Sequence, residues 1–234
     1  VLTGRLAELH FPPTVSSAEN LRKEGIGGER VVITGNTGID ALLYIKAGLE
    51  EGRMKAPAGP PLDPAKKMIL VTGHRRESFG EGFERICEAL ERLAGREDVE
   101  LVYPVHPNPN VKEIVERRLG GQPRIHLIEP QDYVPFVDLM RRSYLILTDS
   151  GGVQEEAPSL GKPVLVLREV TERPEGVEAG TAVVVGTDRD RIVSVASELL
   201  TSRAAYERMA NAVNPYGDGQ ASGRIVAALA ERFG

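Results

Sequence analysis

The sequence predicts an α/β protein built on a doubly wound, Rossmann-like parallel sheet. From Lys67 onward, short aliphatic runs alternate with amphipathic helical segments, which is typical of a parallel sheet. The aliphatic runs are not interrupted by polar residues, so we expect the strands to be buried by helices on both faces. Polar residues gather directly after these runs, at the strand ends where such sheets bind ligands.

Strands and helices are expected to alternate along this part of the chain. The expected strands are 68–72, 99–105, 124–128, 144–148, 163–167 and 182–185. The expected helices are 82–93, 111–119, 133–140, 153–160, 189–200, a segment from about 206, and 221–233. A break at 214–219, Asn-Pro-Tyr-Gly-Asp-Gly, sets the last helix apart.

The first part of the chain does not follow this alternation. We expect a short helix at 17–21, a strand at 31–34 and a helix capped by Asp40, and one strand cannot bury itself. A proline-rich stretch follows and predicts a linker. We therefore expect three parts, which are 1–55, a linker at 56–66 and a Rossmann-like domain at 67–234. Because the chain begins at Val1 without methionine, we expect a longer protein.

The composition excludes several classes of function. A net charge of -5 over 234 residues argues against a nucleic-acid interface, which needs a basic surface. No apolar run approaches the length of a membrane span, so we expect no membrane partner. Cys87 is the only cysteine and lies on an apolar helix face, which excludes disulfide frameworks and thiolate zinc sites. We expect a reducing, cytoplasmic location.

The stretch after the fourth strand of the domain carries the most informative pattern. Thr148-Asp149-Ser150 ends the aliphatic run, and Gly151 and Gly152 then leave the backbone accessible where a helix begins. Free N–H groups and the helix dipole favour an anion there, so we expect a diphosphate. The alternative is an N-cap at Asp149 or Ser150 with nothing bound, and this stretch alone does not separate the two.

Charged residues follow the first strand of the domain. His74 can act near neutral pH as an acid, a base or a phosphate-binding cation, or it can simply bond the local backbone. Arg75 and Arg76 could clamp a phosphate or carboxylate, or they could pair with Glu77 and Glu81. The residue types alone leave both interpretations open.

Further candidates follow the later strands. His106 lies among prolines, where a structural role is equally open, and Gln131 follows the third strand. Glu155 and Glu156 could stabilise the helix dipole, while a carboxylate can also accept both hydroxyls of a ribose. Phe136 repeats with core positions, although a ring at a helix start could also flank a planar base. The chain has no P-loop, no GxGxxG and no metal-ligand spacing, so we expect neither a metal nor any other cofactor.

Taken together, five motifs in order resemble the bacterial UDP-N-acetylglucosamine 2-epimerases of the non-hydrolysing type. They are Thr72-Gly-His-Arg-Arg-Glu-Ser-Phe-Gly, Tyr103-Pro-Val-His-Pro-Asn-Pro-Asn-Val, Asp149-Ser-Gly-Gly-Val-Gln-Glu-Glu-Ala-Pro-Ser-Leu-Gly-Lys-Pro-Val-Leu-Val-Leu-Arg, Thr171-Glu-Arg-Pro-Glu and Asn214-Pro-Tyr-Gly-Asp-Gly. The resemblance implies the C-terminal half of a GT-B architecture, in which two Rossmann-like domains enclose a cleft. Residues 35–40 resemble the point where the chain crosses between the domains.

The resemblance also implies residue roles. It assigns the UDP diphosphate to Ser150, Gly151 and Gly152, with Arg173 beside them, and the ribose to Glu156. The uracil end falls to Gln131 and Phe136, while His74 matches a histidine of the catalytic cleft. Arg75 and His106 resemble positions of a second, regulatory UDP-GlcNAc site.

The resemblance finally implies a reaction, in which UDP-GlcNAc and UDP-ManNAc interconvert through elimination and re-addition of UDP. The family is homodimeric and places its catalytic carboxylates in the N-terminal domain, so we expect this chain to bind UDP and to turn over poorly. Three alternatives remain open: a GT-B glycosyltransferase, a hydrolysing 2-epimerase that releases free ManNAc, and a nucleotide-sugar-binding module without catalysis.

Overall fold

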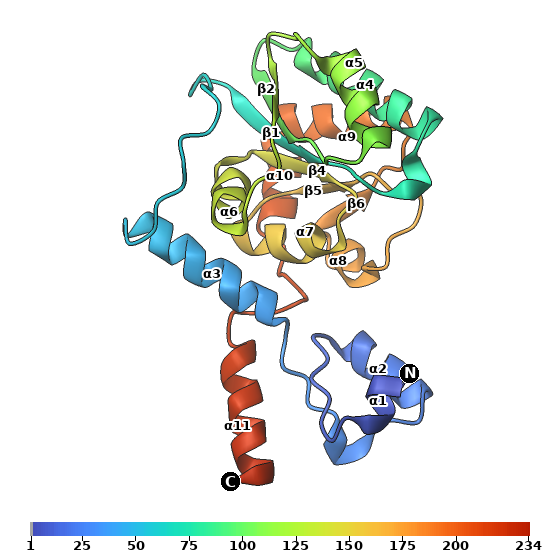
Figure 1. Cartoon of the computed structure of the whole chain (residues 1–234), viewed down its shortest axis with the longest axis vertical. Coiled ribbons are helices and arrows are strands. Elements are labelled where there is room, and N and C mark those ends of the chain that lie inside the picture. The colour runs from blue at the N-terminus through green and yellow to red at the C-terminus, as the bar shows by residue number, and fades with distance from the viewer. Residues whose placement is uncertain (1) are drawn as a thin grey trace.

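A six-stranded parallel sheet forms the centre of the computed structural model, which describes residues 2–234 (Figure 1). The strand order is β3-β2-β1-β4-β5-β6, which confirms the predicted doubly wound α/β fold. The strands are β1 (Lys67–Thr72), β2 (Val99–Pro104), β3 (Ile125–Ile128), β4 (Leu145–Thr148), β5 (Val164–Val166) and β6 (Ala182–Val184). The chain reverses its direction of winding between β1 and β4, so the topological switch point lies there.

Helices cover both faces of this sheet. The helices of the described residues are α1 (Leu2–Leu6), α2 (Val15–Lys23), α3 (Thr37–Glu50), α4 (Glu81–Ala94), α5 (Pro109–Leu119), α6 (Tyr133–Arg142), α7 (Gly151–Glu156), α8 (Pro174–Glu178), α9 (Arg189–Thr201), α10 (Arg203–Ala210) and α11 (Ala221–Phe233). Of these, α1, α2 and α11 lie away from the sheet (Figure 1). Short 3-10 helices cover Gly28–Arg30, Arg76–Ser78 and Ala157–Leu160. In Figure 1, α4, α5 and α9 lie on one side of the sheet, and α3, α6 and α7 lie on the other.

The strands supply alternate side chains to two apolar cores. On β1, Ile69 and Val71 join the core under α4, α5 and α9, whereas Met68 and Leu70 join the core under α3, α6 and α7. This alternation follows from the two-residue period of a strand. Cys87 on α4 is fully buried, and burial raises its pKa to about 12, so the predicted packing of this thiol in the core is confirmed.

The N-terminal part differs from the expectation in two places. The expected strand at 31–34 is wrong, because Val31 forms only an isolated bridge with His10 and has no neighbouring strand. The expected cap at Asp40 is also wrong, since α3 begins at Thr37 and its N-cap is Asn36, whose side chain accepts a bond from the Gly38 N–H. Helices α1 and α8 were not expected at all.

Two glycine-containing segments cross where α3 meets the break before α11. Gly35 has a φ of +89°, and a Cβ added there would meet the Gly217 Cα at 3.4 Å, so the backbones touch. The Asn36 N–H donates to the Tyr216 carbonyl at 2.8 Å. This crossing holds the N-terminal segment and α11 at the same side of the molecule, as Figure 1 shows.

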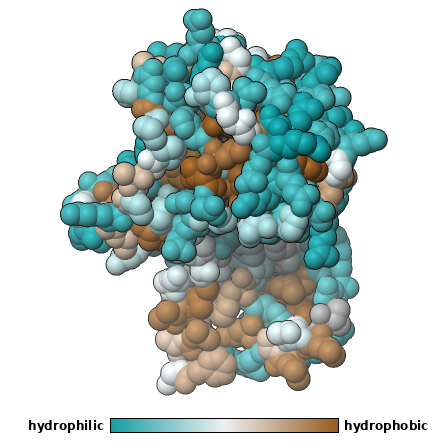
Figure 2. All heavy atoms as spheres, turned by 45° about the horizontal axis from the view of Figure 1, so that its top comes forward, coloured by the Kyte–Doolittle hydropathy of each residue, from teal (hydrophilic) through white to brown (hydrophobic). Residues whose placement is uncertain are grey.

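Apolar side chains are exposed at that end of the molecule. Leu2 and Leu6 on α1 and Val226 and Phe233 on α11 are each more than half exposed. Figure 2 shows apolar residues gathered over this end, whereas the sheet domain above it is mostly hydrophilic. None of the helices within residues 2–234 has the length and apolar composition that crossing a membrane requires.

Candidate functional site

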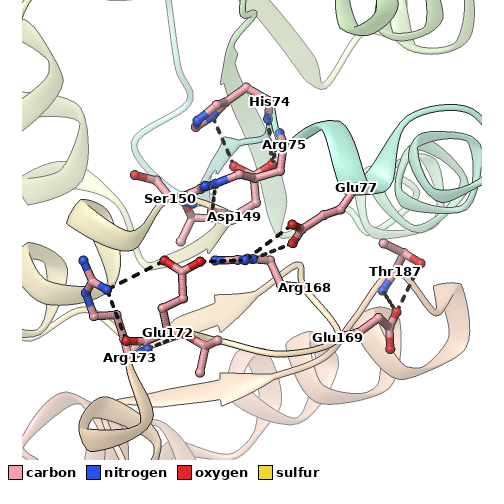
Figure 3. A network of polar contacts seen from close by, with 12 residues as sticks. His74, Arg75, Glu77, Asp149, Ser150, Arg168, Glu169, Glu172, Arg173 and Thr187 are labelled. Atoms are coloured by element: carbon pink, nitrogen blue, oxygen red, sulfur yellow. Dashed lines mark hydrogen bonds and ion pairs between the residues drawn. The ribbon is translucent and has the colours of Figure 1, made fainter. Parts of the chain in front are cut away.

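The candidate site lies at the carboxyl ends of β1 and β4, on either side of the switch point. These neighbouring strands pair in register, with Thr72 opposite Thr148, and the two threonine hydroxyls are 2.6 Å apart. The loops that continue from these threonines therefore meet, and Figure 3 shows His74, Arg75 and Asp149 in contact. An open parallel sheet places its ligands at this position.

Asp149 is a buried carboxylate that organises the loop after β1. Its Oδ2 accepts hydrogen bonds from the backbone N–H groups of His74 and Arg75, both at 2.7 Å. Its Oδ1 lies 3.1 Å from the Nδ1 atom of His74. Asp149 is only 2% exposed, so its charge is compensated by these donors. It therefore bonds the neighbouring loop and does not cap the helix after the glycines, which was one of the expected alternatives.

Two histidines lie side by side at this edge. The rings of His74 and His106 stack with centroids 5.3 Å apart and an angle of 18° between their planes. The Nδ1 atom of His106 accepts a hydrogen bond from the Asn108 N–H at 3.1 Å. Arg75 also belongs to this group, because its Nε donates to the Asp149 carbonyl at 3.3 Å.

Glu77 does not pair with Arg75 or Arg76, which was one of the expected alternatives. It pairs instead with Arg168, whose Nε lies 2.6 Å from the Glu77 carboxylate. The Arg168 side chain is only 8% exposed and also contacts Glu172, as Figure 3 shows. This pair ties the loop after β1 to the loop after β5.

The glycine turn opens α7, two residues earlier than the sequence predicts. Ser150 is the N-cap, and its side chain makes no capping bond. A Cβ added at Gly151 would lie 3.4 Å from the guanidinium nitrogen Nη2 of Arg173, so this cation rests directly against the turn. Gly152 is exposed, and a Cβ there would have no neighbour closer than 3.9 Å. The turn is thus accessible and has a cation beside it.

Glu155 fixes the position of that cation. One of its carboxylate oxygens accepts a hydrogen bond from Arg173 Nε, and the other accepts one from Asn36 Nδ2. Glu155 is 7% exposed, so the interaction with Arg173 is weakly screened by solvent. Because Asn36 belongs to the crossing segment before α3, this carboxylate links the crossing segment to the glycine turn.

Glu156 has a different environment from its neighbour. It accepts a hydrogen bond from the Tyr133 hydroxyl at 3.0 Å, which brings α6 against α7. Burial raises the pKa of Glu156 above its ordinary value, and the nearby Glu155 acts in the same direction, although the Tyr133 bond opposes them. The carboxylate remains partly accessible beside Gly152.

Two predicted site residues lie on the loop and helix after β3. Gln131 is half-buried, and its side-chain amide donates to the Glu129 carbonyl at 2.7 Å. Phe136 packs against the core under α6 while remaining partly exposed. Neither has a direct contact with the glycine turn among the interactions of the described residues, but Tyr133 on the same helix bonds to Glu156.

Several residues have roles in this site that the sequence did not predict. They are Asp149 as the partner of His74, Glu155 as the anchor of Arg173, and Tyr133. The strand register explains the first of these, because pairing of Thr72 with Thr148 makes residues 74 and 149 neighbours. The order of the aliphatic runs along the chain does not reveal which strands are adjacent.

The arrangement suits binding of an anionic ligand. It combines a turn without side chains, the guanidinium of Arg173, and carboxylates that can accept hydroxyl groups. Preorganised donors of this kind stabilise negative charge that develops on a leaving group. Within residues 2–234, no group of three or more His, Cys, Asp or Glu side chains is placed to hold a metal ion.

Comparisons with known proteins show which family this chain resembles. The family model described as UDP-N-acetylglucosamine 2-epimerase matches residues 1–230. The UDP-N-acetylglucosamine 2-epimerase of Escherichia coli (strain K12) is 57% identical over 233 residues, which cover 97% of this chain and 62% of the relative. The crystal structure of UDP-GlcNAc 2-epimerase from Neisseria meningitidis bound to UDP-GlcNAc is 46% identical, with a TM-score of 0.91, and the match covers 98% of this chain and 63% of that one.

A more distant similarity concerns the fold alone. WaaG, a glycosyltransferase involved in lipopolysaccharide biosynthesis, is 18% identical with a TM-score of 0.57, over 97% of this chain and 63% of that one. The chain spans about 62% of the length of the curated relatives that it matches, and it corresponds to their C-terminal portion.

Proposed function

Because the chain belongs to the UDP-N-acetylglucosamine 2-epimerase family, we propose that it forms the UDP-binding portion of an enzyme that interconverts UDP-GlcNAc and UDP-ManNAc. The observation that carries this proposal is the contact between Arg173 and the glycine turn, with Glu155 holding the guanidinium in place. The relative from Neisseria meningitidis, which binds UDP-GlcNAc, supports the choice of ligand.

The diphosphate is assigned to the turn of Ser150, Gly151 and Gly152. The backbone N–H groups at the start of α7 donate to phosphate oxygens, and Arg173 supplies a positive charge from the opposite side. Exposure of Gly152 supports this assignment, because a ligand can reach the backbone there.

The nucleoside is assigned to the neighbouring residues. Glu156 accepts the ribose hydroxyls, and its position beside Gly152 supports a ribose adjacent to the diphosphate. Gln131 and Phe136 flank the uracil, since the helix that carries Phe136 contacts Glu156 through Tyr133. His74 faces the sugar, which places it among the catalytic groups.

The proposed reaction is elimination of UDP followed by its re-addition. When the bond between the anomeric carbon and the diphosphate oxygen breaks, negative charge develops on UDP. Arg173 and the N–H groups of the turn stabilise that charge and lower the barrier. UDP then adds again after inversion at C2, with carboxylates from the N-terminal portion of the enzyme as acid and base.

The division of the chain follows from this assignment. Residues 67–234 form the UDP-binding domain, 56–66 the linker and 1–55 the end of the N-terminal domain with the crossover helix. This division is supported by the lack of helix and strand at 51–66. The exposed apolar side chains of α1 and α11 support packing of the remaining N-terminal portion against that end.

Three further properties are proposed for the whole enzyme. We assign Arg75 and His106 to a second, regulatory UDP-GlcNAc site, because the exposed His106 ring stacks on His74 next to the sugar position. We also propose a homodimer, as in the family. The lone buried Cys87 supports a cytoplasmic location.

Calorimetric titration with UDP tests the proposed site. We expect the chain to bind UDP, and Arg173→Gln to weaken binding by about tenfold or more, since a hydrogen bond to a charged group contributes about 1.5–3 kcal/mol. Gly152→Asp should also lose binding, because the new carboxylate repels the diphosphate. The substitution should not prevent folding, because there is space for the side chain and a negative charge at a helix N-terminus is stabilised by the helix dipole.

The matched control is Arg203→Gln, which removes the charge of a guanidinium that is 90% exposed. This variant should bind UDP as tightly as the unmodified chain. Thermal melts establish that each variant is folded. Unchanged UDP affinity in both Arg173→Gln and Gly152→Asp would place the nucleotide elsewhere.

A further inference from the structure

The hydrogen bonds around Asp149 restrict the protonation of His74. Asp149 Oδ2 is occupied by two backbone N–H donors, and Oδ1 faces the Nδ1 atom of His74 at 3.1 Å. Oδ1 is buried and has no hydrogen-bond partner among the described residues, so the ring nitrogen at the ion-pair distance of 3.1 Å is its close polar neighbour. A carboxylate only accepts hydrogen bonds, so a lone pair on Nδ1 would leave two acceptors facing each other.

We propose that Asp149 is a positioning residue, which holds neutral His74 in the tautomer with its proton on Nδ1. The Nε2 atom then carries the lone pair and accepts hydrogen bonds from a ligand. An isolated neutral imidazole can carry its proton on either ring nitrogen, so it is the Asp149 carboxylate that selects Nδ1 in His74. The tautomer rests on the contacts alone, whereas a role in catalysis rests on the proposed function.

The neighbouring His106 has the opposite tautomer. Its Nδ1 accepts a hydrogen bond from the Asn108 backbone N–H, which can only donate. The proton of the neutral His106 ring therefore resides on Nε2. The two stacked rings thus present one accepting and one donating nitrogen to the same edge of the sheet.

This pairing gives the two rings different chemical roles. His74 Nε2 accepts a hydrogen bond from a hydroxyl or amide group of the sugar, and the buried charge of Asp149 stabilises positive charge that develops on the ring. His106 Nε2 donates to an oxygen atom. The two rings therefore suit different ligand groups, a donor at His74 and an acceptor at His106, in keeping with their assignment to two neighbouring sites.

Nitrogen NMR of the chain labelled with ¹⁵N-histidine tests the assignment, since the chain has only four histidines. Spectra are recorded without ligand and at alkaline pH, so that neutral rings are compared. Protonated and unprotonated ring nitrogens resonate in separate regions. We expect His74 to be protonated on Nδ1 and His106 on Nε2. A neutral His74 protonated on Nε2 overturns the proposal.

The variant Asp149→Asn sharpens this test. Its amide oxygen must remain where it accepts the two backbone N–H groups, so the amide nitrogen takes the Oδ1 position and donates to His74 Nδ1. We therefore expect the His74 proton to move to Nε2, as an asparagine substitution does in a serine-protease triad. His106 is the internal reference and should not change.

Asp98→Asn is the matched control, because it makes the same change before β2, at the opposite edge of the sheet. It should leave His74 protonated on Nδ1. If His74 keeps that tautomer in folded Asp149→Asn as well, the proposal is wrong. If Asp149→Asn does not fold, the spectrum of the unmodified chain still decides.

A kinetic readout separates this proposal from the proposed function. In a catalytically complete enzyme, Asp149→Asn should lower kcat by about 10²-fold or more, the range of acid–base contributions, with a smaller change in KM. If kcat is unchanged while the tautomers are as expected, Asp149 positions the His74 proton but does not contribute to catalysis. Absence of UDP binding by a chain with the expected tautomers would instead contradict the proposed function.

Discussion

At the scale of single residues, adjacent carboxylates in this site have different tasks because they have different partners. Glu155 accepts hydrogen bonds from Arg173 and Asn36, which hold it in place. Among the described residues, the side chain of Glu156 has one hydrogen-bond partner, the Tyr133 hydroxyl, and burial raises its pKa. Ionisation of Glu156 is therefore costly in the free protein. Ribose hydroxyls that donate hydrogen bonds to this carboxylate would stabilise its charged form.

This difference predicts how stability depends on pH. The pKa of Glu156 is higher in the folded chain than in the unfolded chain, so the unfolded chain favours the charged form. Protonated Glu156 therefore contributes fully to the stability of the folded chain at pH values below the ordinary glutamate pKa of about 4.3. This contribution is lost as the pH rises through the raised pKa of the folded state. We therefore expect Glu156→Gln to raise the melting temperature at pH 7 and to change it little near pH 4.

Thermal melts at the two pH values check this expectation. Glu113→Gln is the matched control, because Glu113 is exposed on α5 and its substitution removes the same charge. A stabilisation by Glu156→Gln that is equal at both pH values would show that burial of the charge is not its cause.

At the scale of elements, α11 is held at its start by a residue of another helix. Gln220, its N-cap, makes no side-chain capping bond. Instead, the two oxygens of Asp40 on α3 accept the N–H groups of Ala221 and Ser222, at 3.1 and 2.7 Å. Burial alone would raise the pKa of Asp40, but these bonds outweigh it and hold the pKa below its usual range. Asp40 therefore fixes the direction in which α11 leaves the domain.

Asp40→Ala should destabilise the chain by about 1 kcal/mol, the usual cost of removing a helix cap. Because the loss is local, amide hydrogen exchange in α11 should accelerate more than exchange in the sheet. Glu207→Ala is the control, since its exposed ion pair with Arg203 lies on α10 and contributes little. Unchanged exchange in α11 of Asp40→Ala would show that other contacts orient this helix.

The elements also show what could be predicted from the sequence. Apart from the unexpected α8, the strands and helices from Lys67 onward were predicted close to their observed positions, because their periodicity is local information. The bonds of Asp40 to α11 and of Asp149 to His74 join residues 75 or more positions apart. Both residues looked like local helix caps, because Asp favours caps and the sequence does not show a distant partner.

At the scale of the whole molecule, the chain is a parallel-sheet domain with an exposed apolar end. The candidate site lies at the carboxyl ends of β1 and β4, and α11 and the N-terminal segment extend from the same domain (Figure 1). Since the chain spans about 62% of its relatives, we propose that the remaining portion closes the site and supplies the catalytic carboxylates. Nucleotide binding and turnover should therefore be separable.

The most direct measurement is product analysis by NMR after incubation with UDP-GlcNAc alone. Two proteins are compared, which are the 234-residue chain and a chain extended by the N-terminal portion of its relatives. We predict that the extended chain forms UDP-ManNAc without any acceptor, whereas the 234-residue chain does not. Free ManNAc would indicate a hydrolysing enzyme, and a requirement for an acceptor would indicate a glycosyltransferase. Formation of UDP-ManNAc by the 234-residue chain alone would contradict the proposed division of the enzyme.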